Sequence, residues 1–122
     1  MHALIIEDEQ LIAMAIEDVL KDCGFKSFDF ATSAEAAVQA ASRQCPDFIT
    51  SDVRLSPGCG IEAVQSICSG AEIPVIFITG NGADLTLRSP GHQLLDKPFS
   101  DQALVDAVSA ALSTTVKQSS RI

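Results

Sequence analysis

Short apolar runs alternate along the chain with longer stretches in which apolar and polar residues are mixed. The runs, each of strand length, cover residues 3–7, 26–30, 47–51, 73–78 and 93–96. Residues 10–23, between the first two runs, carry apolar side chains three and four positions apart, which is typical of a helix with one buried face. Strands that alternate with helices predict a parallel sheet with right-handed crossovers and helices on both faces, the α/β class.

Turn and capping residues set the bounds of the first two predicted helices. Gly24 follows the first amphipathic stretch and is suited to a left-handed residue at a helix end. Thr32 or Ser33 can cap a helix over residues 34–43, whose alanines favour the helical state. The sequence therefore predicts two ordinary crossover helices in its first half.

The second half of the chain departs from regular alternation. A third helix is predicted over residues 61–69, and Ser100 or Asp101 can cap a last helix that runs to about residue 112. Residues 80–92 contain glycines and a proline, which penalise a helix interior by about 1 and 3 kcal/mol relative to alanine. We expect the fourth helix to be missing or reduced to one turn.

Length and charge restrict the class of protein. The 122 residues suffice for one domain, which we expect over residues 1–113, followed by a polar tail over residues 114–122 with no further domain. The apolar runs are too short to span a membrane, and we expect a cytoplasmic protein without a leader. A net charge of −8 argues against binding to nucleic acid or anionic membranes.

The four cysteines form no C-x-x-C pair and no zinc-binding pattern. In a chain without a secretion signal we expect them to be reduced, with a redox-sensing pair as the alternative. The two histidines, His2 and His92, are expected to be solvated and to take no part in the chemistry.

Four of the apolar runs are followed by side chains suited to phosphate chemistry. Glu7 ends the first run and Asp8 follows it, Asp52 follows the third, Thr79 the fourth and Lys97 the last. Because the carboxyl ends of parallel strands meet at one edge of the sheet, we expect these side chains to share a pocket.

Three carboxylates in one pocket repel one another, and a divalent cation removes that repulsion. Mg²⁺ fits because it prefers oxygen ligands and often takes only one or two carboxylates. The predicted magnesium site comprises Glu7, Asp8 and Asp52, with the backbone carbonyl of Arg54 as a further ligand. Taken alone, Glu7-Asp8-Glu9 could equally be a solvated acidic start to a helix, but a position at a strand end beside Asp52 favours the metal site. For Arg54, a side chain that lies in solvent remains an equal alternative.

Asp52 is the candidate nucleophile, because an aspartyl carboxylate at a strand end can accept a phosphoryl group as an acyl phosphate. Lys97 can neutralise one phosphoryl oxygen and Thr79 can donate a hydrogen bond to another. Taken singly, a surface lysine or a threonine bonded to nearby backbone is the more plausible interpretation, and it is the combination with Asp52 at matched strand ends that favours function. Pro98 also raises the chance of a cis peptide bond after Lys97.

With these residues in place, the sequence resembles the receiver domain of two-component response regulators. The matching pieces are the runs that end in Glu7-Asp8-Glu9, Ser51-Asp52, Thr79-Gly80 and Lys97-Pro98-Phe99, in the family's order. The resemblance covers residues 1 to about 112 and implies a flavodoxin-like five-stranded sheet of order 2-1-3-4-5.

The resemblance also implies roles for the site residues. Asp52 would accept a phosphoryl group from the phosphohistidine of a sensor histidine kinase or histidine phosphotransfer protein. Asp8, Asp52 and the Arg54 carbonyl would bind Mg²⁺ directly, and Glu7 would bind it through water. Thr79 and Lys97 would contact the phosphoryl group.

Three features depart from the usual receiver pattern. Glu7 replaces the commoner aspartate, the spacing from Thr79 to Lys97 is about one helical turn short, and Leu94 stands where a switch aromatic is usual. The run over residues 74–80 is similar to receivers with an altered fourth helix that act in general-stress signalling.

We therefore expect a stand-alone receiver, a phosphoprotein in a phosphorelay that signals through a downstream protein partner and is not a turnover enzyme. A phosphorylation-independent binding module of the same fold is the alternative. A phosphohydrolase is disfavoured, because Arg54 stands where such an enzyme needs a second acid.

Overall fold

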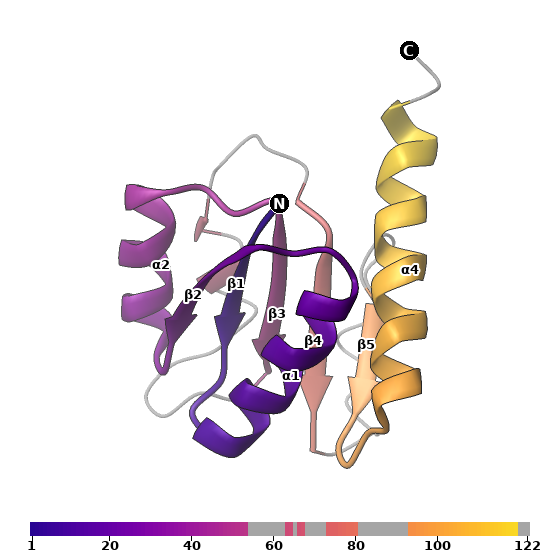
Figure 1. The fold of residues 1–122 in the computed structure, drawn as a ribbon. Coiled ribbons are helices and arrows are strands. Elements are labelled where there is room, and N and C mark those ends of the chain that lie inside the picture. Colours follow the sequence, from indigo (N-terminus) through magenta and orange to yellow (C-terminus); the bar gives the residue numbers. More distant parts are fainter. Residues whose placement is uncertain (54–62, 65, 68–72, 81–92, 120–122) are drawn as a thin grey trace.

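The structure is a computed structural model that describes residues 1–53, 63–64, 66–67, 73–80 and 93–119, with side chains to residue 113. Five strands form one parallel sheet of order β2-β1-β3-β4-β5 (Figure 1). The strands are β1 (His2–Ile6), β2 (Ser27–Ala31), β3 (Phe48–Asp52), β4 (Val75–Thr79) and β5 (Gln93–Asp96). The predicted class and strand order are both confirmed.

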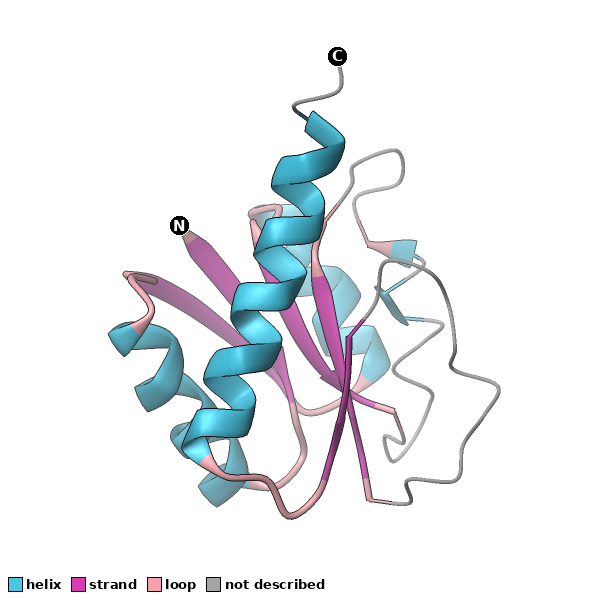
Figure 2. Ribbon diagram, turned by 90° about the vertical axis from the view of Figure 1, so that its right-hand side faces the viewer, coloured by secondary structure: helices cyan, strands magenta, loops and turns pink. Residues whose placement is uncertain are grey.

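The helices lie on both faces of the sheet. Helices α1 (Gln10–Asp22) and α4 (Asp101–Ser119) lie side by side on one face, and α2 (Ala34–Arg43) covers the other (Figure 1). Figure 2 shows α4 running along the sheet from a view at right angles to the first. Beyond these three, Ala63, Val64 and Ser66 are helical, within the predicted third helix.

Two hydrophobic clusters, one on each face, form the core. Along β1, Ala3 and Ile5 pack with α1 and α4, whereas Leu4 and Ile6 pack with α2. This division follows from the pleat of a strand, which sends successive side chains to opposite faces. Because both faces are covered, all five residues of β3 and of β4 are buried, which explains the continuous apolar run over residues 75–78.

The local signals for the first two helices are confirmed. Gly24 has a φ of 102° just after α1, in the region that favours glycine. The Ser33 hydroxyl accepts a hydrogen bond of 3.1 Å from the backbone N–H of Ala36, so Ser33 is the cap of α2.

The last helix is longer than predicted. Its start is right, since the hydroxyl of Ser100 accepts from the Ala103 N–H at 3.1 Å. The predicted end near residue 112 is wrong, because α4 continues to Ser119. Residues 113–119 are polar but contain neither glycine nor proline, so nothing in them stops a helix. Most of the expected tail is therefore helical, and α4 extends past the sheet in Figure 1.

A second correction concerns His2, the first residue of β1. His2, expected in solvent, is 6% exposed. Its Nδ1 lies 2.7 Å from the Ser27 hydroxyl and its Nε2 lies 2.9 Å from Asp29. Its backbone N–H donates to the Asp47 carboxylate at 2.8 Å. His2 thus joins the start of β1 to β2 and to the residue before β3.

The cysteines also differ from expectation. Cys45 is disulfide-bonded, so the prediction that all four are reduced is wrong at this position. Cys23 keeps a free thiol, and burial and then the charge of Asp22 raise its pKa above that of an ordinary thiol.

Among the described helices, none is long and apolar enough to cross a membrane. The predictions for residues 80–92, which include His92, fall outside the described residues except at Gly80.

Candidate functional site

The carboxyl ends of four neighbouring strands meet at one edge of the sheet. The register pairs Ile6 with Ser51, Asp52 with Ile78, and Thr79 with Asp96. Glu7 directly follows β1 and Lys97 directly follows β5, so both leave the sheet at the edge where β3 and β4 end. The predicted gathering of these residues is what parallel pairing produces.

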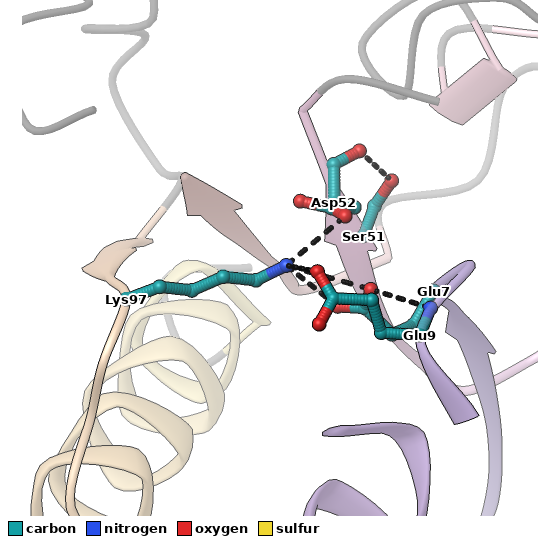
Figure 3. Close-up of polar contacts among 5 residues, drawn as sticks. All are labelled: Glu7, Glu9, Ser51, Asp52 and Lys97. Carbon is teal, nitrogen blue, oxygen red and sulfur yellow. Dashed lines mark hydrogen bonds and ion pairs between the residues drawn. The ribbon is translucent and has the colours of Figure 1, made fainter. Parts of the chain in front are cut away.

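The Lys97 ammonium lies among carboxylates (Figure 3). Its Nζ donates hydrogen bonds to Asp52 Oδ2 at 3.2 Å and to Glu7 Oε2 at 3.4 Å. It is also 3.2 Å from the other Glu7 oxygen and 3.8 Å from Oε1 of Glu9. Glu7 and Asp52 are 3% and 7% exposed, so the two closest anions are buried, whereas the Lys97 side chain is half-buried.

Backbone contacts hold Lys97 and Asp52 in place. The N–H of Lys97 donates to the carbonyl of Thr79 at 2.8 Å, which ties the end of β5 to the end of β4. The Lys97–Pro98 peptide bond is cis, as the sequence suggested. The hydroxyl of Ser51 donates to the Asp52 carbonyl at 3.0 Å (Figure 3). The acidic side chain therefore sits on a fixed strand end.

Glu7, Asp8 and Asp52 can together hold a metal ion. One oxygen from each lies within 4.8 Å of the others, and Asp8 is exposed while the other two are buried. Glu7 Oε1 is buried and has no hydrogen-bond partner, although Lys97 Nζ lies at ion-pair distance. A buried carboxylate oxygen of this kind is costly unless it is paired. The donor set, all oxygen and all acidic, fits Mg²⁺.

Burial and the neighbouring charges at the site shift two pKa values. Burial raises the pKa of Glu7 to about 7; the N–H of Glu9 and the Lys97 ammonium oppose that shift, whereas the charge of Asp52 adds to it. For Lys97, burial lowers the pKa, but the hydrogen bond to Asp52 and the charges of Glu7 and Asp52 outweigh it and leave the pKa raised. Burial is the largest influence on the pKa of Glu7 because its carboxylate is almost fully enclosed.

The remaining predicted site residues have different outcomes. Thr79 is buried at the end of β4, at the same sheet edge as Asp52. The backbone carbonyl of Arg54 lies outside the described residues. Leu94, at the position of the missing switch aromatic, is 40% exposed in β5.

Glu9, for which the sequence predicts no separate role, lies beside the site. Glu9 is the residue before α1, yet its side chain makes no capping hydrogen bond. Its N–H instead donates to Glu7 Oε2 at 3.1 Å, and its carboxylate faces Lys97. Three acidic residues in a row gave no signal that would distinguish a residue at the site from a solvated one.

The fold and this edge of the sheet define a class of protein: a five-stranded α/β domain that collects an acidic pair, an aspartate and a lysine at the carboxyl ends of its strands. The family model described as response regulator receiver domain matches residues 3–109. The chain belongs to this family of two-component signalling proteins.

Two relatives show how the similarity is distributed. The transcriptional regulatory protein PdtaR of Mycobacterium tuberculosis is 32% identical over 116 residues, which are 92% of this chain and 57% of PdtaR. The phyllosphere-induced regulator PhyR of Methylorubrum extorquens is 37% identical over 113 residues, 89% of this chain and 42% of PhyR. The chain therefore spans about half the length of these relatives.

Solved structures agree with that relationship. The response regulator PhyR from Brucella abortus has a TM-score of 0.86 at 31% identity, covering 97% of this chain and 50% of that one. The receiver domain of PhyR from Erythrobacter litoralis has a TM-score of 0.80 at 32% identity, covering 91% of this chain and 88% of that one. The chain is thus a receiver domain similar to that of PhyR.

Proposed function

We propose that this receiver accepts a phosphoryl group on Asp52 and signals through contacts with another protein. The observation that carries the proposal is the position of the Asp52 carboxylate, buried at a strand end and hydrogen-bonded at 3.2 Å to Lys97. A lysine so placed neutralises charge where a phosphoryl oxygen has to lie.

The proposed transfer is a direct displacement at phosphorus. A carboxylate oxygen of Asp52 forms the new O–P bond while the N–P bond of a phosphohistidine breaks. The departing imidazole nitrogen takes the electron pair of the N–P bond, and a proton on the ring makes the leaving group a neutral imidazole. The product is an aspartyl phosphate. Lys97 is already directed at Asp52 and would follow the charge onto the phosphoryl oxygens, and Thr79 would donate from the end of β4.

Glu7, Asp8 and Asp52 are the residues that would hold Mg²⁺, together with the Arg54 carbonyl that the sequence suggests. When bound there, Mg²⁺ supplies positive charge that offsets the three carboxylates and the incoming phosphoryl oxygens. The chain's own part is to hold Asp52 on β3, to keep Glu7 buried against Lys97, and to leave Asp8 accessible from solvent.

The phosphodonor we propose is a sensor histidine kinase or a histidine phosphotransfer protein, in the cytoplasm. For the output, relatives offer a direction: PhyR of Bartonella quintana is titled an anti-anti-sigma factor, and it is 33% identical with a TM-score of 0.85. A further PhyR structure, 34% identical with a TM-score of 0.79, is titled a stress response regulator. We propose that this receiver acts in general-stress signalling, through a protein partner and as a signalling module rather than an enzyme.

A labelling experiment tests the phosphoacceptor. The protein is incubated with a small phosphodonor and Mg²⁺, and the mass and the stability of the label to alkali are measured. We expect one phosphoryl group per chain, labile to alkali and dependent on Mg²⁺, and none on Asp52→Asn. Asp18→Asn is the control, since Asp18 is an exposed aspartate of α1 and lies away from the site.

Two outcomes would count against the assignment. A label of equal amount on the Asp52→Asn variant would place the acceptor elsewhere. Absence of label on the unaltered protein with every donor, together with unchanged partner binding by Asp52→Asn, would favour a phosphorylation-independent binding module.

A further inference from the structure

Glu9 is an exposed acidic residue beside the site, and it has no assigned role. It lies next to the acidic pair in the sequence, and its side chain is 64% exposed. The first position before a helix usually belongs to a side chain that accepts a hydrogen bond from the first turn. Glu9 occupies that position and makes no such bond. Its carboxylate has a different neighbour.

That neighbour is the Lys97 ammonium, 3.8 Å away (Figure 3). The backbone of Glu9 is held toward the site as well, because its N–H donates to Glu7 Oε2 at 3.1 Å. Lys97 therefore faces three carboxylates from two parts of the chain. Glu7 and Asp52 contact it from buried positions at 3.2 Å, and Glu9 contacts it from the solvent side.

We propose that Glu9 is a positioning residue that lowers the rate of phosphoryl transfer to Asp52 by competing for Lys97. This inference rests on the proposed function. A phosphoryl group on Asp52 needs the Lys97 ammonium as its counter-charge. The Glu9 carboxylate attracts the same ammonium from the solvent side and so opposes its approach to the phosphoryl oxygens.

The size of the effect follows from exposure. Pairs between exposed charges change an equilibrium or a rate by a factor of about 2 to 5, and added salt weakens them. Glu7 and Asp52 are buried and hydrogen-bonded, so they hold Lys97 more strongly than Glu9 does. Glu9 thus adjusts a rate that the buried residues make possible.

The test compares phosphorylation rates with a small anionic phosphodonor at fixed Mg²⁺. We expect Glu9→Gln to be phosphorylated about 2- to 5-fold faster than the unaltered protein at low salt, and by a smaller factor at about 0.5 M salt, where the Debye length falls to a few ångströms. Asp18→Asn removes the same charge from an exposed position of α1 and is expected to leave the rate unchanged.

A double-mutant cycle identifies the route of the effect. In a Lys97→Met background, Glu9→Gln should give no gain, because the ammonium for which Glu9 competes is gone. Lys97→Gln replaces the methionine variant if the latter does not fold. Equal gains with and without Lys97, or no gain in the otherwise unaltered chain, would overturn the proposal. Failure of the unaltered protein to become phosphorylated is a separate result and would instead refute the proposed function.

Discussion

The buried carboxylate of Glu7 gives a prediction about stability that needs no partner and no phosphodonor. Burial raises its pKa from 4.5 to about 7, so the folded chain binds this proton more tightly than the unfolded chain does. For an acid with a raised pKa, the stabilising effect of the proton is complete below pH 4.5. It is lost as the pH rises and is absent above about pH 7.

The magnitude follows from that shift. A change from 4.5 to about 7 corresponds to at most about 3 kcal/mol at 1.36 kcal/mol per pH unit. Glu7→Gln keeps an oxygen for the N–H of Glu9 and for Lys97 but cannot ionise. Without Mg²⁺ at pH 8, we expect the variant to have a free energy of unfolding up to about 3 kcal/mol above that of the unaltered protein. At pH 4 the two should be equal.

Urea unfolding followed by circular dichroism, with a chelator present, measures this difference at both pH values. Added Mg²⁺ should reverse the order at pH 8, because the unaltered protein gains a charged ligand and the variant does not. Glu35→Gln, an exposed acid in the first turn of α2, is the matched control and should show no comparable pH-dependent gain. A glutamine variant that is equally stable or less stable at pH 8 in chelator would refute the argument that burial controls the pKa of Glu7.

Two further predictions concern the rest of the chain. His2→Ala should lower the free energy of unfolding by about 1–3 kcal/mol, because it removes buried contacts to Ser27 and Asp29. Phosphoryl uptake should be unchanged, because His2 lies at the amino end of β1 and the site lies at its carboxyl end. A loss of uptake without a loss of stability would contradict this. Cys45 should resist alkylation until a reductant is added, as mass spectrometry can check. Cys23 should react without reductant, and faster as the pH rises. Equal labelling of Cys23 and Cys45 before reduction would disprove the disulfide at Cys45.

Much of the fold followed from local pattern. The predicted strands were right to within two residues, and β1 and β4, which are buried on both faces, carry the continuous apolar residues that such strands need. Gly24 and Ser33 marked helix ends because backbone sterics and one local hydrogen bond decide them. The end of α4 does not follow from composition, because the polar residues 113–119 continue the helix and none of them is a glycine or a proline.

The sequence alone determined which groups gather at the carboxyl edge of the sheet, since parallel pairing places every strand end there whatever the details of packing. Only the tertiary structure decided how those groups share their charges. Glu7 and Lys97 are 90 positions apart, and the burial that raises the pKa of Glu7 arises from chain segments distant in sequence. The same holds for the enclosure of His2 and for the approach of Glu9 to Lys97. Burial and charge pairing depend on distances across the fold, which a linear pattern of residue types does not contain.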